Sequence, residues 1–141
     1  MKNLLLLIFF LTLTGCKSSL VVKATYENDA VYFTSDELVS TCNNAPIYLF
    51  SINVAQKACT VNCVYWEVVD DQDTLDVEPT TIPLLYGSHI PGRTTRTTAK
   101  SLVEGTYHLS AAVGCNDYSA YAYGDFRVKQ LNHSTVIENL N

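Results

Sequence analysis

The chain has 141 residues, a formal net charge of −5 and a hydrophobic fraction of 48%. That length provides one domain with a sizeable core and leaves no room for a second. The acidic balance argues against nucleic acid as a partner and against charge-driven adhesion to anionic lipid.

The first segment has the layout of a secretory signal. A short basic start is followed by an apolar run from Leu4 to Leu13 and then by small residues. This order is typical of an export signal with a cleavage site. The run is shorter than the roughly 20 residues that a transmembrane helix needs.

The end of this segment, Leu13-Thr14-Gly15-Cys16, resembles the lipobox of bacterial lipoproteins. The resemblance implies that residues 1–15 are a cleaved signal peptide, that Cys16 is lipidated and that residues 16–19 form a short tether. Because Lys17 follows the cysteine, the resemblance also implies the outer membrane of a Gram-negative bacterium as the location.

Residues 20–130 are predicted to form a β domain. Runs rich in β-branched and aromatic residues alternate with turn residues. We expect strands at about 20–26, 30–34, 47–54, 63–69, 80–86, 94–101, 107–114 and 119–129. Ser35 is expected to cap one helical turn. The basic residues of 92–100 predict a charged strand near a sheet edge. Residues 131–141 are expected to be a polar C-terminal tail.

The segment from Leu102 to Tyr107, Leu-x-x-Gly-x-Tyr, resembles the tyrosine corner of immunoglobulin-like and fibronectin-type sandwiches. In that motif the tyrosine hydroxyl ties the start of a strand to the preceding loop. Trp66 is expected to be the core tryptophan of an earlier central strand. The fold class expected is therefore all-β, a single immunoglobulin-like sandwich of about 7–8 antiparallel strands. It lacks the inter-sheet disulfide of antibody domains, because Leu109 stands two residues after Tyr107.

Four cysteines remain besides Cys16, an even number in a chain expected to enter an oxidising compartment. They are Cys42, Cys59, Cys63 and Cys115. Two disulfides are expected, and the sequence leaves their pairing open. Cys115 pairs with Cys63 or Cys59 if their two strands run antiparallel side by side; otherwise Cys59 pairs with Cys63 and Cys42 with Cys115. A zinc site is not expected, since no second close cysteine pair and no nearby histidine accompany Cys59 and Cys63.

The sequence predicts no catalytic residue, metal site or cofactor. His89, His108 and His133 are scattered, and no nucleophile signature such as Gly-x-Ser-x-Gly lies near them. Residues 70–78 contain five carboxylates. They lack the spacing of a calcium-binding loop, so a solvated acidic loop is expected.

Side-chain alternation predicts an exposed face rich in tyrosine on the sheet that contains residues 107–114 and 119–129. Exposed tyrosines beside small residues suit a binding contact, because tyrosine provides a large contact area and a polar tip. The residues expected on this face are Tyr65, Glu67, His108, Tyr121 and Tyr123.

Together these patterns predict a cell-envelope lipoprotein that is not an enzyme and acts as a binding or assembly accessory. Its expected partners are the membrane, through the lipid, and an envelope protein. The alternatives are a periplasmic inhibitor of a host hydrolase, such as a lysozyme or protease, and a small envelope enzyme.

Overall fold

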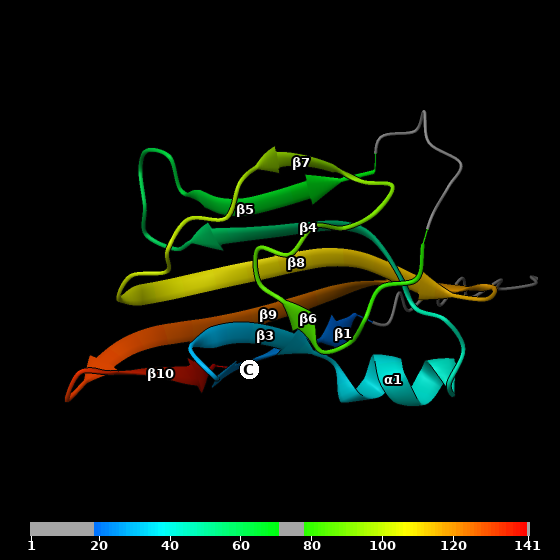
Figure 1. Ribbon diagram of the computed structural model, residues 1–141, viewed down its shortest axis with the longest axis horizontal. Coiled ribbons are helices and arrows are strands. Elements are labelled where there is room, and N and C mark those ends of the chain that lie inside the picture. The colour runs from blue at the N-terminus through cyan, green and yellow to red at the C-terminus, as the bar shows by residue number, and fades with distance from the viewer. Residues whose placement is uncertain (1–18, 71–77, 141) are drawn as a thin grey trace, which may run out of the picture.

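The computed structural model describes residues 19–70 and 78–140. The expected signal peptide, Cys16 and residues 71–77 of the acidic segment lie outside the described residues. The described chain forms two β-sheets that pack against each other, with one short helix (Figure 1). The elements are β1 (Leu20–Val21), β2 (Lys23–Glu27), β3 (Ala30–Thr34), α1 (Asp36–Cys42), β4 (Tyr48–Gln56), β5 (Val64–Val69), β6 (Leu84–Leu85), β7 (Thr94–Thr97), β8 (Gly105–Cys115), β9 (Tyr118–Leu131) and β10 (Ser134–Asn139).

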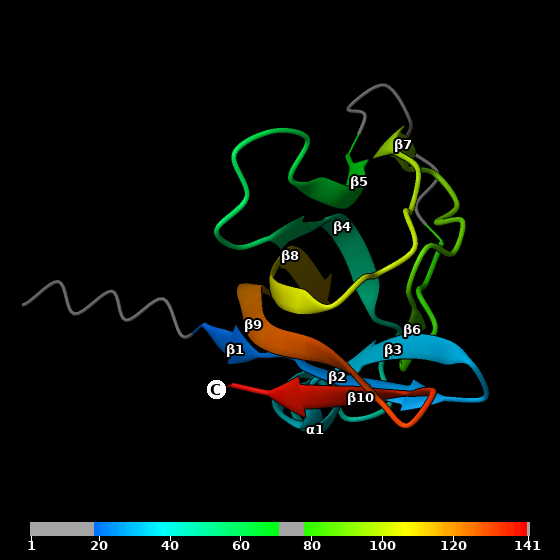
Figure 2. The same cartoon turned by 90° about the vertical axis from the view of Figure 1, so that its left-hand side faces the viewer.

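The large sheet has the strand order β1-β9-β8-β4-β5-β7, and β10 also pairs with β9. The small sheet has the order β2-β3-β6. In Figure 2, β5 and β7 lie at the opposite end of the molecule from β2, β10 and α1. Because the described residues form ten strands and one short helix, the all-β class is confirmed.

The expectation of 7–8 strands, all antiparallel, is corrected in two respects. Residues 19–70 and 78–140 contain ten strands, and β1 pairs with β9 in parallel. The single strand expected at 20–26 is divided at Val22, where the chain leaves the large sheet for the small one. Gly124 permits this crossing, because a Cβ atom there would lie 2.4 Å from the Val22 carbonyl oxygen.

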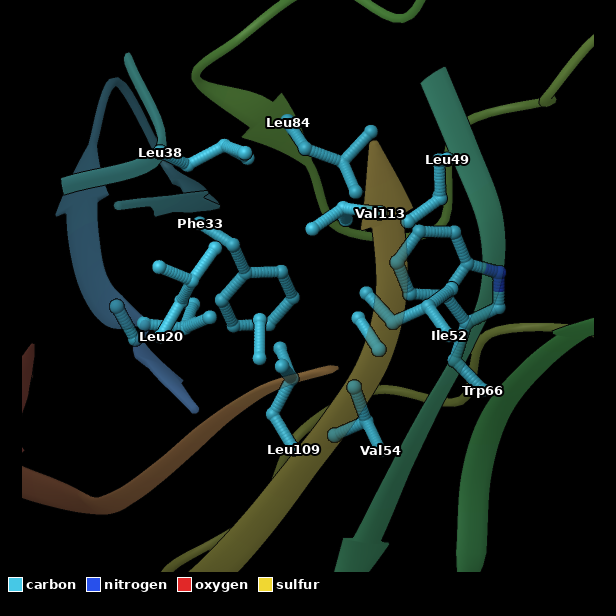
Figure 3. Close-up of a cluster of buried hydrophobic side chains, with 14 of the residues drawn as sticks. Leu20, Phe33, Leu38, Leu49, Ile52, Val54, Trp66, Leu84, Leu109 and Val113 are labelled. Carbon is cyan, nitrogen blue, oxygen red and sulfur yellow. The ribbon is translucent and has the colours of Figure 1, made fainter. Parts of the chain in front are cut away.

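One core fills the space between the sheets (Figure 3). Trp66 is 1% exposed, as expected for the core tryptophan. Along β9, Ala122, Gly124, Phe126 and Val128 are buried, and the residues that alternate with them, Tyr123, Asp125 and Arg127, lie on the outer face. The alternation predicted for this strand is thus confirmed.

Tyr107 is fully buried and bonds back to the preceding loop. Its hydroxyl donates to the carbonyl oxygen of Val103 at 2.9 Å and accepts from the Val103 N–H at 3.0 Å. Burial raises the pKa of Tyr107 to about 12, so the hydroxyl keeps its proton at physiological pH. The hydrogen bond expected of the corner motif is present.

Helix α1 begins where the sequence predicts. The Ser35 side chain accepts a hydrogen bond from the Leu38 N–H, which satisfies one of the free donors at the helix start. Asn43 ends the helix in the left-handed conformation, which asparagine tolerates better than most residues.

The disulfides are Cys42–Cys115 and Cys59–Cys63. A bond from Cys115 to Cys59 or Cys63 is excluded by strand direction. Strand β4 lies between β5 and β8 and is antiparallel to both, so β5 and β8 run the same way. Cys63, just before β5, therefore lies at the opposite end of the sheet from Cys115.

The C-terminal residues are not a separate tail. Strand β10 pairs with β9 along its whole length. At its end, the Asn139 side chain accepts from the Ala24 N–H at 2.8 Å and donates to the Ala24 carbonyl oxygen at 2.9 Å. This exchange imitates a β-ladder between the two sheets and extends the domain beyond the boundary expected at residue 130.

Candidate functional site

Four strands contribute to an open groove on the outer face of the large sheet. One register row forms its centre. Tyr123 of β9 lies opposite Ser110 of β8, and Ser110 lies opposite Asn53 of β4. Asn53 in turn lies opposite Glu67 of β5. Because neighbouring strands are about 4.8 Å apart, the row spans ~14 Å.

The groove has a volume of about 300 Å³. Tyr121 and Tyr123 line it from β9, and Glu67 and Val69 line it from β5. The residues between these two sides are small or short, including Ser51 and Ser110. The hollow therefore follows from side-chain size, since large side chains on the outer strands flank short ones on the inner strands.

Three rings form a row along the β8 and β9 side of the groove. The rings of His108 and Tyr123 are 6.1 Å apart and 19° from parallel, and those of Tyr123 and Tyr121 are 6.5 Å apart and 24° from parallel. Tyr121 is 52% exposed and Tyr123 is 41% exposed. Adjacent near-parallel rings limit one another's rotation, so the tyrosines are partly ordered before any ligand arrives.

Asp125 holds the far end of this row. Its carboxylate forms an ion pair with Lys57 and a contact of 2.6 Å with His108 Nδ1. The hydrogen bonds from Lys57 and His108 lower the pKa of Asp125 below its usual range. The carboxylate is therefore charged at neutral pH, and it fixes the ring plane of His108 against Tyr123.

The polar groups of the groove are not used to hold the fold. Within residues 19–70 and 78–140, no hydrogen bond or ion pair engages the side chains of Glu67, Asn53 or Ser110. All three are partly buried. They are accordingly available to a ligand or to water.

Four of the five residues expected on the tyrosine face lie on it, namely Glu67, His108, Tyr121 and Tyr123. The placement of Tyr65 is wrong. Val54 pairs with Trp66 and Ala55 pairs with Val64, so Tyr65 is an extra residue in a β-bulge. Its ring instead packs edge-on against buried Tyr107, with 5.1 Å between centroids. A bulge interrupts the alternation on which the prediction rested.

Two further expectations concern charged residues. Strand β7 lies at the edge of the large sheet, as predicted. Arg93, just before it, is buried rather than part of a charged face, and its guanidinium bonds to the Leu49 carbonyl oxygen and to Asp70. Its buried position follows from these partners and from the Phe50 ring below it.

Ser51, Asn53 and Lys57 were not expected at the site. For Ser51 and Asn53 the signal was present, since they alternate with buried Ile52 and Val54. Lys57 gave no such signal, because it is brought to Asp125 only by the pairing of β4 with β8 and of β8 with β9.

No group of three or more histidine, cysteine or acidic side chains in the described part of the chain is arranged to hold a metal ion. In the same part, no helix has both the length and the apolar character needed to cross a bilayer. Comparison with protein families, with curated proteins and with solved structures gives no match to this chain.

Proposed function

We propose that this protein is a lipid-anchored binding module of the cell envelope, without catalytic activity, and that it serves as an accessory to another envelope component. The groove on the outer face is its binding site. The observation that carries the proposal is the pairing of ordered, exposed rings with Glu67 and Asn53, whose polar groups have no partner in the described structure. Few convergent polar groups beside aromatic surface are typical of ligand sites.

The anchoring part of the proposal rests on the lipobox resemblance at Cys16. It places the protein on the outer membrane, with acyl chains on one residue supplying the attachment. An acidic chain with a net charge of −5 gains nothing from anionic lipid, so the lipid is the attachment that the sequence supports.

We also propose that the sandwich is a variant of the immunoglobulin-like fold. The order β9-β8-β4-β5 corresponds to strands G, F, C and C′ of variable-type domains, and Tyr107 has the hydrogen bond of a tyrosine corner. Tyr107 lies near the start of β8, which is the F position in this assignment.

A non-catalytic role is supported by the state of the candidate reactive groups. Cys42, Cys59, Cys63 and Cys115 are all oxidised. Asp125 and His108 are engaged in ordering the ring row.

One observation favours the second candidate function, inhibition of a hydrolase. The Cys59–Cys63 disulfide closes a short loop between β4 and β5, on which Val61 is 73% exposed. Lys100 Nζ donates to the carbonyl oxygens of Asn62 and Val64 and holds the loop further. A rigid loop that presents an apolar side chain is suited to enter a cleft.

Site-specific photocrosslinking tests both candidates in native membranes. A photoreactive residue is placed at position 121 in the groove, at 61 on the loop or at 32 on the small sheet as control, and adducts are identified by mass spectrometry. The proposal predicts one reproducible adduct from position 121 that disappears when Tyr123→Ser is added. An adduct from 61 alone would favour the inhibitor, and equal adducts from 121 and 32 would contradict a binding groove.

A further inference from the structure

We infer that the ligand of the groove is an uncharged or amine-bearing carbohydrate chain. This inference rests on the proposed function, because it assigns a chemical class to the ligand of the same site. It is carried by the distribution of polar and aromatic groups along the register row from Tyr123 to Glu67.

The groups in the row match the two kinds of surface on a sugar ring. A pyranose has an apolar C–H face, which packs on aromatic rings, and a rim of hydroxyls that donate and accept hydrogen bonds. Tyr121 and Tyr123 supply the rings. Glu67 accepts two hydroxyl donors, and the Asn53 amide both donates and accepts.

The shape of the groove fits a chain rather than a single small molecule. It is open and crosses four strands, and the polar and aromatic ends of its central row lie ~14 Å apart on strand spacing. One sugar unit stacked at Tyr123 would leave Glu67 without a partner. A short oligosaccharide that crosses the strands reaches both ends and lies over Ser110 and Asn53.

Charge excludes several other ligand classes. Glu67 is the carboxylate of the central row, and Asp125 lies beyond the ring row with its charge already paired to Lys57. A phosphate, a sulfated glycan or an anionic lipid headgroup would be repelled by Glu67. A neutral sugar is not repelled, and an amino sugar would be attracted.

The structure also disfavours the common modes of peptide recognition. Strands β8 and β4 are paired on both sides, so their backbone groups cannot receive an added strand. An amphipathic helix needs an apolar groove, whereas Ser51, Asn53 and Ser110 line this one between its walls.

The ring row is ordered in advance from Lys57 to Tyr121, which reduces the entropy lost on binding. His108 acts here as a positioning residue, because it orients Tyr123 and is itself held by Asp125. Its role predicts that His108→Ala weakens binding less than Tyr121→Ser and that His108→Phe, which keeps a flat ring, retains part of the affinity.

The test uses isothermal titration calorimetry on the mature protein, which begins at Cys16 and carries its lipid, in detergent micelles. The probes are tetrasaccharides of glucose, N-acetylglucosamine and glucosamine, with heparin as the anionic probe. We expect at least one of the three tetrasaccharides to bind and heparin not to bind. Tyr121→Ser and Glu67→Gln should each weaken binding by about tenfold or more. The matched controls, Tyr32→Ser on the small sheet and Glu27→Gln on β2, should leave the affinity unchanged.

Each outcome decides the inference. Binding of heparin, or binding of any of the three tetrasaccharides that is unaffected by Tyr121→Ser and Glu67→Gln, would overturn it. A protein adduct from position 121 with no sugar binding would overturn the carbohydrate class and leave the proposed binding groove standing. The absence of both sugar binding and any adduct from position 121 would refute the two together. Circular dichroism of each variant ensures that a loss of binding is not a loss of fold.

Discussion

Asp125 is the residue whose charge state links the groove to pH. Its carboxylate accepts from Lys57 and from His108, and these contacts lower its pKa. The pKa in the unfolded chain is about 4, which is above that in the fold. Asp125 therefore contributes stability that is complete above the unfolded pKa and is lost as pH falls through the folded pKa.

We predict that Asp125→Asn lowers the free energy of unfolding at pH 7 by about 1 kcal/mol. The difference between the two proteins should shrink below about pH 4 and vanish once Asp125 is protonated in the folded protein. Urea unfolding of both proteins between pH 7 and pH 2.5 measures this difference.

Asp36→Asn is the matched control. Asp36 also pairs with a lysine, Lys23, at 3.0 Å, but its side chain is 77% exposed. Exposed pairs of this kind contribute little, so Asp36→Asn should have a small effect. A deficit of Asp125→Asn that is as large at pH 2.5 as at pH 7 would show that charge is not its source.

At the same scale, the candidate site could be predicted only where neighbouring residues obey simple alternation. Tyr121 and Tyr123 follow from the period of two along β9, and Glu67 follows from its position next to buried Trp66 and Val68. Tyr65 does not, because the bulge depends on how β5 pairs with β4. Lys57 approaches Asp125 across 68 positions in the sequence, and no local pattern encodes that distance.

Among the elements, the two disulfides constrain the chain very differently. Cys42–Cys115 joins residues 73 positions apart and attaches the end of α1 to the end of β8. Cys59–Cys63 joins residues four positions apart within one connection. In the chain-entropy account, a longer closed loop removes more freedom from the unfolded chain.

We predict that the double variant Cys42→Ala, Cys115→Ala loses about 4 kcal/mol of unfolding free energy, and that Cys59→Ala, Cys63→Ala loses about 2 kcal/mol or less. Guanidinium unfolding of each variant and of the oxidised protein measures both values. The second variant should retain the sugar or partner affinity of the groove, since Val69 and Glu67 lie farther along β5. Equal losses would show that loop length does not govern the effect.

The elements themselves were predictable where their signals are local. The strand at 30–34 and the cap at Ser35 were expected and are present, because turn residues and a capping side chain act within a few positions. The direction of β5 relative to β8 was not predictable, since it depends on β4 being inserted between them. Strand β10 was missed because its residues are mostly polar and it owes its position to pairing with β9.

For the whole molecule, the position of β1 relates the groove to the membrane. Leu20 pairs with Ala122 and Val21 pairs with Tyr123, so the first strand lies beside the tyrosine side of the groove. The chain makes four residue-to-residue steps from Cys16 to Leu20, and these span at most about 14 Å even when fully extended. If Cys16 is lipidated, the groove lies close to the membrane surface, and its ligand must be reachable there.

The proposed lipid on Cys16 leads to a prediction about where the whole molecule is found in the cell. We expect Cys16→Ser to move the protein from the membrane fraction to the soluble fraction, because the acyl chains are the only attachment that the proposal provides. The thermal unfolding midpoint should be unchanged, since the described strands begin at β1, after residue 16. Fractionation followed by intact-mass measurement tests this, and Ser18→Ala serves as the matched control that should remain in the membrane fraction. Cys16→Ser could instead stay with the membrane, with a mass that differs from that of the parent only by the substituted atom. The attachment would then be made by the folded protein, and the distance argument that links the tether to the groove would no longer follow.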